Sequence, residues 1–565
     1  MTARAAVAAA LVALALPAGV AAAAAGDRDG GFGTGGEAIV PLGPGARAAA
    51  IALAPDGRLV IAGDGRGAGG EKVLTARFDA AGALDRSFAT TGARLDQLGS
   101  GEPTQRAGAV LAQADGGTLV AAAAGDQFAL ARFGPDGLAD GLFGAGGVAL
   151  RTPAGDGGGL PAGTGPAAIA AMPTGQIVVA GSAGVATDDD VPGERIVVAR
   201  YSDRGVPDPG FGHDGFTLLQ LGAASPRAHA ASAARALVVL PDGRILIAGR
   251  ATDRAGAQRV FVARLTAAGA LDTTFARGGR LLAQLGRASA LRAAGSRLDA
   301  LALRPDGTLL AAGSATDVAG NDAVLLARFT AAGALDARFG RGGTVLSQLA
   351  APAGGVVPRS AARALVLAPD GSALVAGAAT GGALAARYGA STGRLDCGFG
   401  IAGRTVAFGG AGFDPATDGA AAALLTPAGG LVLAGRRAGG GVLLGRLLTA
   451  PLAAAPVRPS VLTLAPHYGG KGRGYGYGLV DGRCRALTVR FEVSAPGRRT
   501  VRTVVQRVAA SPGPQVVCAP LRGLRPGVRY FVRVVAPAGA GAGGGRRALR
   551  AVARGARLLP QEGCG

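Results

Sequence analysis

Histidine, cysteine, lysine and tryptophan are scarce or missing in this chain of 565 residues. It has three histidines, four cysteines and no tryptophan, and Lys72 and Lys471 are its only lysines. His213, His229 and His467 are not spaced with one another or with a cysteine as zinc ligands are. No Gly-x-Ser-x-Gly elbow, phosphate-binding loop or paired Cys and His occurs. We therefore assign no catalytic residue, metal ligand or bound cofactor, and we expect a protein that is not an enzyme.

Long apolar segments are missing after the first 25 residues, MTARAAVAAALVALALPAGVAAAAA. This opening has an Arg-bearing start, an apolar run and a string of small residues, which is the layout of a signal peptide over residues 1–25, cleaved near Ala25. An uncleaved anchor is the alternative, because the run approaches the ~20 residues of a spanning helix. We expect a secreted, extracellular, monomeric protein, with cell-surface association left open.

Four cysteines are too few for a disulfide scaffold of this length, although they are compatible with export. Cys397 lies in a repeated motif described below, where we expect a small buried residue. Cys564 is unassigned, and whether it pairs with Cys397 is left open.

A sequence repeat dominates the chain, with three separate markers that each occur seven times. The first is Asp-x-x-Phe, whose Phe-to-Phe steps are 56, 55, 68, 64, 64 and 60 residues. The second is a Pro-Asp-Gly turn, intact in four copies and degraded in three, and the third is the arginine of an Ala-Arg-Phe segment. The first marker occurs at Asp29 and Phe32, Asp85 and Phe88, Asp140 and Phe143, Asp208 and Phe211, Asp272 and Phe275, Asp336 and Phe339, and Asp396 and Phe399. The arginines are Arg77, Arg132, Arg200, Arg264, Arg328, Arg387 and Arg446.

Each repeat predicts four β-strands. Residues 236–240, 244–249 and 259–265 are short β-branched runs separated by turn residues, and a further strand follows Phe-Gly-x-Gly-Gly, as at 216–222. Four antiparallel strands in each of seven repeats predict an all-β fold, a seven-bladed β-propeller over residues 27–448.

The markers at the two ends of the repeat region indicate a closed ring. Asp29 has no arginine before it and Arg446 has no aspartate after it, so closure would bring the two together. We expect the arginine at the end of one blade's last strand, with the aspartate and phenylalanine on the crossover into the next blade. The phenylalanine would plug the gap between blades, and the aspartate would accept hydrogen bonds from the crossover backbone, from the arginine, or from both. The alternative is a ring of seven metal or ligand sites, but one carboxylate per repeat falls short of a Ca²⁺ shell.

These motifs resemble a known family. Gly-Ala-Leu-Asp-x-x-Phe-Gly-x-Gly-Gly followed by Pro-Asp-Gly-x-x-Leu-x-Ala-Gly and Leu-Ala-Arg-Phe is similar to the delta-60 repeat proteins, exported bacterial chains expected to form β-propellers. The resemblance covers residues 27–448 and implies the fold, while it implies no activity. Ala89 and Ala276 depart from it, because glycine usually follows the phenylalanine there.

A second domain follows the repeats. Residues 449–459 predict a linker, residues 460–545 a small β-sandwich and residues 546–565 a basic tail, within which 546–559 is either an amphipathic stretch or a final strand. Residues 521–535 resemble a corner of a fibronectin type III domain through Leu524 and Tyr530. The resemblance implies a tyrosine corner, in which the Tyr530 hydroxyl bonds to nearby backbone. It also places Cys484 and Cys518 on neighbouring strands, which implies a disulfide between them.

Positive charge is concentrated in this second domain. Residues 457–565 carry 19 Arg and Lys against three acids, a net charge of +16 out of +21 for the whole chain. Such a surface attracts anionic cell-envelope polymers, although an arginine-rich solvated surface is the plain alternative. HYGGKGRGYGYG, residues 467–478, has the composition of a single-strand nucleic-acid binder. We expect a flexible loop there and no nucleic-acid partner.

The long connections of the repeats lie on one rim of the predicted ring, opposite the Pro-Asp-Gly and Asp-x-x-Phe turns. Binding loops vary upon a constant scaffold, so we expect a protein or carbohydrate ligand on this variable rim, around repeats three to five. The acid cluster at 188–190 could help to bind Ca²⁺, but an exposed loop explains it as well. The favoured function is non-enzymatic binding. The alternative is a propeller hydrolase or lyase, which would need several carboxylates or histidines in the central channel.

Overall fold

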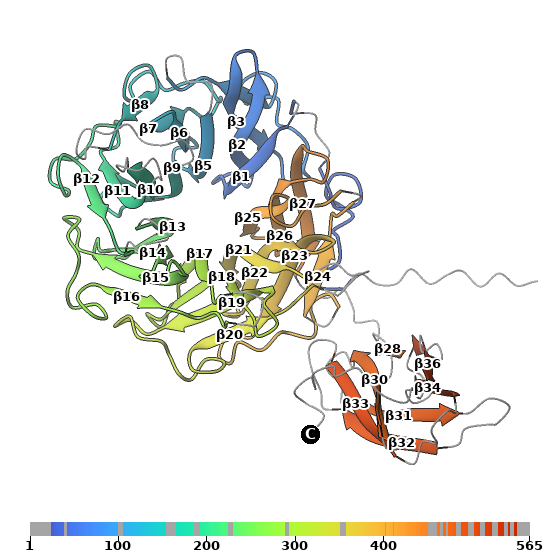
Figure 1. The fold of residues 1–565 in the computed structure, drawn as a ribbon. Helices are drawn as coiled ribbons and strands as arrows, with labels where there is room; N and C mark the ends of the chain where they lie inside the picture. The colour runs from blue at the N-terminus through green and yellow to red at the C-terminus, as the bar shows by residue number, and fades with distance from the viewer. Residues whose placement is uncertain are drawn as a thin grey trace, which may run out of the picture.

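The computed structural model describes residues 24–449 except 39–41, 44, 100–104, 154–164, 186–192, 224–229, 289–292, 351–357, 402 and 411, and beyond 449 the strands named below. The described chain is all-β, and seven separate sheets stand around a common centre (Figure 1). The predicted seven-bladed β-propeller is confirmed. No helix in the described part of the chain is long and apolar enough to span a membrane.

Blades one to six are four-stranded antiparallel sheets whose strands follow one another in sequence order. Blades one to three comprise β1 (Arg47–Leu53), β2 (Leu59–Gly67), β3 (Gly70–Phe78), β4 (Ala93–Asp96), β5 (Gln105–Ala112), β6 (Thr118–Ala124), β7 (Gln127–Phe133), β8 (Val148–Arg151), β9 (Gly165–Ala171), β10 (Ile177–Val185), β11 (Gly193–Tyr201) and β12 (Phe216–Leu219). Blades four to six comprise β13 (Ser232–Val239), β14 (Ile245–Thr252), β15 (Gln258–Leu265), β16 (Arg280–Ala283), β17 (Ser296–Leu303), β18 (Leu309–Thr316), β19 (Asp322–Phe329), β20 (Thr344–Ser347), β21 (Ser360–Leu367), β22 (Ala373–Ala379), β23 (Gly382–Tyr388) and β24 (Arg404–Ala407).

The fourth strand of each of these blades follows the Asp-x-x-Phe turn and pairs with the third strand of the same blade. In blade one, Ala93 of β4 lies opposite Ala76 of β3. The expectation that this turn crosses into the next blade was therefore wrong. The Arg77 N–H donates to the Gly92 carbonyl and the Gly92 N–H donates to the Phe88 carbonyl, so the chain folds back onto the strand that it has just left.

Blade seven is completed by the beginning of the chain. Its own strands are β25 (Gly419–Leu425), β26 (Gly430–Arg436) and β27 (Val442–Leu448). Glu37 forms an antiparallel bridge with Gly445, and the Ala38 N–H donates to the Leu444 carbonyl at 2.8 Å. The segment from residue 24 to 38, here called the closing segment, thus takes the place of a fourth strand and joins the two ends of the ring.

The hydrophobic core lies between neighbouring blades. The seven marker phenylalanines are at most 1% exposed. Gly137 of blade two faces Phe88 of blade one so closely that a Cβ there would collide with the ring, and five further phenylalanines meet a glycine in the next blade in the same way. Each buried phenylalanine contributes roughly 1.5–3 kcal/mol, so these side chains hold the blades together as expected.

A β-bulge occurs at the same place in the innermost strand of every blade. In blade four the register shifts between Ala234 and Ala236, so Arg235 is the extra residue. Opposite it lies Gly249, the last glycine of the Pro-Asp-Gly-x-x-Leu-x-Ala-Gly motif, where a Cβ would collide with the Ala233 carbonyl. Glycine at this position therefore permits the close approach that the bulge requires. The bulged residues of blades one to seven are Ala49, Gly108, Ala167, Arg235, Asp299, Arg363 and Ala421.

The second domain is a small β-sandwich, as predicted, with two sheets in the orders β29-β30-β28-β35, β33 also pairing with β30, and β32-β31-β34-β36 (Figure 1). Its strands are β28 (Ser460–Thr463), β29 (His467–Gly470), β30 (Arg473–Asp481), β31 (Leu487–Ser494), β32 (Arg502–Val508), β33 (Gln515–Arg522), β34 (Arg529–Val535), β35 (Gly541–Ala542) and β36 (Arg547–Arg550).

Two expectations for this domain were wrong. The segment expected to be a flexible loop at 467–478 forms β29 and β30, which pair with His467 opposite Tyr475. We expected the strand that follows Cys484 and the strand that contains Cys518 to be neighbours. These strands are β31 and β33, and they lie in different sheets, because β31 pairs with β32 and β34 whereas β33 pairs with β30. In the tail, β36 pairs with β34, which agrees with the final-strand alternative for those residues.

Candidate functional site

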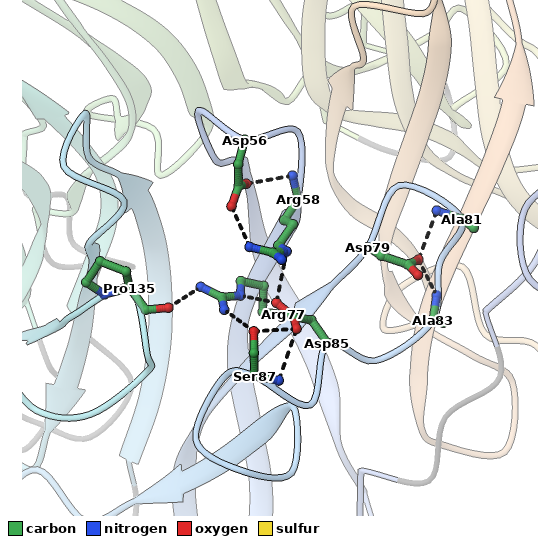
Figure 2. Close-up of polar contacts among 9 residues, drawn as sticks. All are labelled: Asp56, Arg58, Arg77, Asp79, Ala81, Ala83, Asp85, Ser87 and Pro135. Atoms are coloured by element: carbon green, nitrogen blue, oxygen red, sulfur yellow. Dashed lines mark hydrogen bonds and ion pairs between the residues drawn. The ribbon is translucent and has the colours of Figure 1, made fainter.

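Two of the repeat markers, the arginine and Asp-x-x-Phe, meet in an interblade clamp, which we define as the Arg, Asp and Phe of one blade together with a backbone carbonyl of the next. Arg77 donates from Nε to Asp85 and from a terminal nitrogen to the Pro135 carbonyl of blade two (Figure 2). Its guanidinium carbon lies 4.9 Å from the centre of the Phe88 ring. The Asp85 carboxylate also accepts the Ser87 backbone N–H at 3.0 Å. The aspartate thus accepts hydrogen bonds from both the turn backbone and the arginine.

The polar contacts of the clamp recur around the whole ring, and in five blades the arginine also lies over the marker phenylalanine. In every blade the marker arginine donates to or pairs with the marker aspartate, at the positions given above. Each arginine also donates to a carbonyl of the following blade, and the accepting residues after Pro135 are Asp203, Ala267, Ala331, Ala390 with Ser391, Thr449 and, at ring closure, Ala80.

Two clamp carboxylates, Asp272 and Asp85, have a lowered pKa. Hydrogen bonds from Thr274, together with Arg264, lower the pKa of Asp272 to about 2 despite burial, which raises it. In blade one burial raises the pKa of Asp85, but hydrogen bonds from Ser87 and Arg77 lower it overall. Because partners within the protein already occupy these groups, we interpret the clamps as structural.

A different set of side chains lines the central channel. The channel has a volume of about 1590 Å³, and half of the residues that line it are alanine or glycine. Seven arginines and two aspartates line it, and no histidine does so among the described residues. The two aspartates are Asp126 and Asp299.

The bulges aim one residue of every blade into this channel. All seven bulged residues line it. Four blades supply alanine or glycine, whereas the adjacent blades four, five and six supply Arg235, Asp299 and Arg363. Arg235 comes three residues after β13 begins at Ser232, so this charged arc lies near the rim that carries the long connections. The candidate site therefore lies on one side of the channel, at blades four, five and six.

Arg235 is the most open member of the arc. Its side chain is exposed to the channel and has no hydrogen-bond or salt-bridge partner among the described residues. Burial within the channel lowers its pKa, Asp299 raises it, and Arg250 lowers it again. A cation in such a place carries a field that no contacting carboxylate neutralises.

Arg363 is fixed in position but not neutralised. Its terminal nitrogens donate to the backbone carbonyls of Asp418, Pro415 and Ala416 at 2.8–3.0 Å. Burial lowers its pKa, and Arg297 lowers it further. Carbonyl contacts orient the guanidinium without removing its charge.

The other five channel arginines have carboxylate partners. Arg297 donates from Nε to Asp299 at 2.9 Å, and Arg250 lies 2.7 Å from Glu194. The remaining pairs are Arg47 with Asp64 at 2.8 Å, Arg106 with Glu71 at 3.1 Å and Arg436 with Asp418 at 3.6 Å. Among the described residues, only Arg235 and Arg363 line the channel as cations without a carboxylate within salt-bridge distance.

Several residues singled out in the sequence lie elsewhere. His213 is exposed in a turn of blade three, with 85% of its side chain accessible. Cys397 is exposed and disulfide-bonded, so the expectation of a small buried residue was wrong. Cys397 faces solvent because the side chain that this turn buries is that of Phe399. No group of three or more His, Cys, Asp or Glu side chains in the described ranges could hold a metal ion.

Other expectations fall outside the described residues. These are residues 188–190, His229, Cys484, Leu524 and Cys564, together with the side chains of Cys518 and Tyr530. The disulfide between Cys484 and Cys518, the tyrosine corner and the pairing of Cys564 remain predictions.

The arginine arc was missed by sequence reasoning. Arg235 and Arg363 each end an identical Ser-Ala-Ala-Arg segment, which looks like one more arginine in an arginine-rich chain. The sequence nevertheless indicated that the two arginines are equivalent, since Arg235 and Arg363 stand at the same distance before their Pro-Asp-Gly turns. Only the bulge shows that this position faces the channel.

Comparisons with known proteins support the propeller. Residues 54–88, 240–275 and 304–339 match a family described as a domain of unknown function (DUF5122) beta-propeller. Each matched segment runs from a Pro-Asp-Gly turn to the next Asp-x-x-Phe marker. The match supports a propeller repeat family for these repeats. No curated protein matches the chain.

The solved structures that resemble the chain do so at low sequence identity and low TM-score. Polysaccharide lyase Uly1 is 11% identical, with a TM-score of 0.39, and the likeness covers 76% of this chain and 97% of the lyase. Sqt1 of Chaetomium thermophilum is 13% identical, with a TM-score of 0.36, covering 72% of this chain and 96% of Sqt1. Sqt1 bound to the N-terminus of ribosomal protein L10 is also similar, at 13% identity and a TM-score of 0.35, with coverage of 78% and 95%.

Proposed function

We propose that the protein is a secreted, non-enzymatic binding protein that takes an anionic ligand at the mouth of its propeller channel. The observation that carries this proposal is that Arg235 and Arg363 face the channel without a contacting carboxylate, whereas the other five channel arginines have one. Channel walls exclude bulk water in part, so the charges act on a ligand with less screening than on an open surface.

The variable rim supplies the surroundings of this site. The long connections that precede β13, β17 and β21 enter the channel mouth at Ser232, Ser296 and Ser360, next to the charged arc. A ligand held by the arc would therefore also meet the residues in which the blades differ most.

The alternative function is a hydrolase or lyase with its site in the same channel. General acid–base catalysis needs paired groups with matched pKa values. Among the described channel residues, the acids are Asp126 and Asp299, and Asp299 is already paired with Arg297. With so few acidic groups available for proton transfer, the channel residues favour binding over catalysis.

The channel proposal is tested by titrating the full-length protein with anionic polymers across a salt series. Polygalacturonate, polyglutamate and polyphosphate serve as probes, and dextran is the neutral control. We expect salt-sensitive binding of at least one polyanion, weakened about tenfold or more when Arg235→Gln and Arg363→Gln are combined. Arg338→Gln with Arg341→Gln, which removes two exposed charges from the opposite rim, is the matched control. Unchanged binding by the channel variant would sink the proposal.

The second domain is proposed to be a fibronectin type III-like module that tethers the protein to anionic envelope polymers. Its sheets, β28-β30-β33 and β32-β31-β34-β36, support the first part, and the net charge of +16 supports the second. Arg490 and Arg507 are exposed on the neighbouring strands β31 and β32. Replacing both with glutamine in the full chain should reduce its retention on immobilised polyglycerol phosphate and lower the salt needed for elution. Equal retention would contradict tethering by this surface.

The repeat region is likewise proposed to belong to the delta-60 type. Glycine after the phenylalanine, the Pro-Asp-Gly turns and the clamp arginines support this assignment. An alignment built from the described bulges and clamps would test it, because delta-60 chains that lack either feature would contradict it.

A further inference from the structure

On the premise that the proposed anion site exists, the alternation of charge along the arc narrows the class of ligand that would fit it. Blades four, five and six present Arg235, then Asp299, then Arg363 at equivalent bulge positions. Between these two cations, Asp299, whose charge Arg297 offsets, offers a ligand a hydrogen-bond acceptor and no cation. It favours a ligand that offers a hydrogen-bond donor between two anionic groups.

The size of the channel points to an oligomer. A volume of about 1590 Å³ exceeds the range of ≈ 300–1,000 Å³ that is usual for a single small ligand. Alanine and glycine form most of the remaining wall, so a chain can lie against it without displacing side chains. The arc provides polar contacts along one side only.

We infer that the site takes an oligosaccharide that carries carboxylate groups, such as an oligouronate. Carboxylates of the sugar would pair with Arg235 and Arg363, and a ring hydroxyl would donate to Asp299. Arg297, which donates to Asp299 from Nε, holds that carboxylate in place for the hydroxyl. Guanidinium groups suit carboxylates because they offer planar, paired donors.

The test compares ligands that differ either in their charge or in their hydroxyl groups. Calorimetric titration of the full-length protein uses oligogalacturonate, its methyl ester, polyglutamate of equal length and polyphosphate. Oligogalacturonate should bind best, and its methyl ester should lose about tenfold or more. Asp299→Asn should lower the ratio of affinities for oligogalacturonate over polyphosphate about fivefold or more, because a charged acceptor makes the stronger hydrogen bond.

The outcomes separate this inference from the proposed function. Tighter binding of polyglutamate, or an unchanged affinity ratio in Asp299→Asn, would overturn the sugar ligand while the dependence on Arg235 and Arg363 persists. Loss of all polyanion binding would overturn both. A melting curve of each variant shows that it is folded before it is titrated.

A second inference rests on the start of the ring. Ala24-Ala25-Gly26 stands three residues before Asp29, just as Ala80-Ala81-Gly82 stands before Asp85. Gly26 and Gly82 have φ angles of 90° and 87°. These first residues of the closing segment therefore complete the same turn that every other blade builds from its own chain.

The contacts of this turn bind it to blade six. The Gly400 N–H donates to the Ala25 carbonyl at 2.5 Å, as the Gly33 N–H does to the Ala81 carbonyl at 2.7 Å. Ala25 is 1% exposed and packs in the core. The Ala24 N–H donates to the Asp27 carboxylate at 2.7 Å. Removal of residues 1–25 would delete these interactions.

We propose that the leader is cleaved on the amino side of Ala24, at the Ala23–Ala24 bond. Water adds across this peptide bond, which leaves a carboxylate on Ala23 and an ammonium group on Ala24. That ammonium lies where the Ala24 N–H already meets Asp27, so cleavage converts a hydrogen bond into an ion pair. Small residues at Ala21 and Ala23 satisfy the usual requirement of the cleaving peptidase.

Export of the complete precursor, followed by amino-terminal sequencing of the secreted protein, tests this. The expected first residue is Ala24, and a start at Gly26 or beyond would overturn the proposal. As a second measurement, chains that begin at Ala24 and at Gly26 after an enzymatically removed tag are compared by melting. The longer chain should melt about 2–4 °C higher, and equal melting points would contradict the role of the turn.

Discussion

Arg446 and Asp29, 417 residues apart in sequence, form the ion pair that closes the propeller, with the arginine Nε 2.7 Å from the carboxylate. The same arginine donates to the Ala80 carbonyl of blade one and lies 4.8 Å from the Phe32 ring. The closing contact is therefore another copy of the interblade clamp. Unlike the other six, it is made by two segments that no short chain connects.

Arg446→Gln should weaken the closure more than the ring as a whole. Loss of the cation leaves Asp29 partly buried and unpaired, which costs about 1–3 kcal/mol. Amide hydrogen exchange should accelerate most in the closing segment and in β27. Arg338→Gln, on an exposed turn, is the control and should change stability by less than about 0.5 kcal/mol. Uniform exchange across all blades in Arg446→Gln would contradict this account.

Ala276→Gly should stabilise the protein. Ala276 and Ala89 adopt the left-handed conformation, with φ of 48° and 49°, where other blades have glycine. Strain of about 1–2 kcal/mol is relieved when a side chain leaves this region, partly offset by the greater freedom of glycine in the unfolded chain. The urea midpoint of Ala276→Gly should rise. Gly340→Ala, the reverse change in blade five, should lower it.

Gly249→Ala should destabilise blade four through its bulge. A Cβ at this position collides with the Ala233 carbonyl, so the inner strand must shift. We expect a loss of about 1–3 kcal/mol in chemical denaturation. Gly30→Ala is the matched control, because nothing lies within 4 Å of the added atom. Since the bulge aims Arg235 into the channel, polyanion binding should fall together with stability. Unchanged binding would contradict the link between the bulge and the anion site.

Acid should weaken the clamp of blade four in a defined pH range. The pKa of Asp272 is about 2 in the folded chain, with hydrogen bonds from Thr274 and Arg264, against an ordinary value of 3.8. The stabilisation by this carboxylate is complete above about pH 4 and is lost as the pH falls through about 2. Asp272→Asn should therefore be less stable than the native chain at pH 6, with a difference that shrinks toward pH 2. As a control, Asp203→Asn changes an exposed residue, and its stability should vary with pH as that of the native chain does.

The ring itself could be predicted from sequence because its markers serve assembly. Phe88, Asp85 and Arg77 recur in every blade since each blade must meet the next in the same way. Spacing alone did not show to which blade the strand after Gly92 belongs. A short strand after a tight turn can pair backward or forward, and backbone hydrogen bonds between Arg77 and Gly92 decide the matter.

The charged arc could not be predicted for a related reason. Arg235 and Arg363 are among many arginines, and alternation along a strand would have placed them on a face by parity alone. A bulge breaks that parity, and its presence depends on the glycine of the opposing strand. The function that we propose depends on the differences among blades at one equivalent position, whereas the repeat reveals what the blades share.

The closing segment also dictates an order of events during synthesis. Residues 24–38 leave the ribosome before every blade, yet their partner β27 is made only after the other blades have emerged. Until then the closing segment and the unfinished blade seven present unpaired sheet edges, which are prone to pair with other molecules. A chain that stops before Val442 keeps those edges permanently. Premature termination should therefore yield aggregates instead of a smaller working propeller.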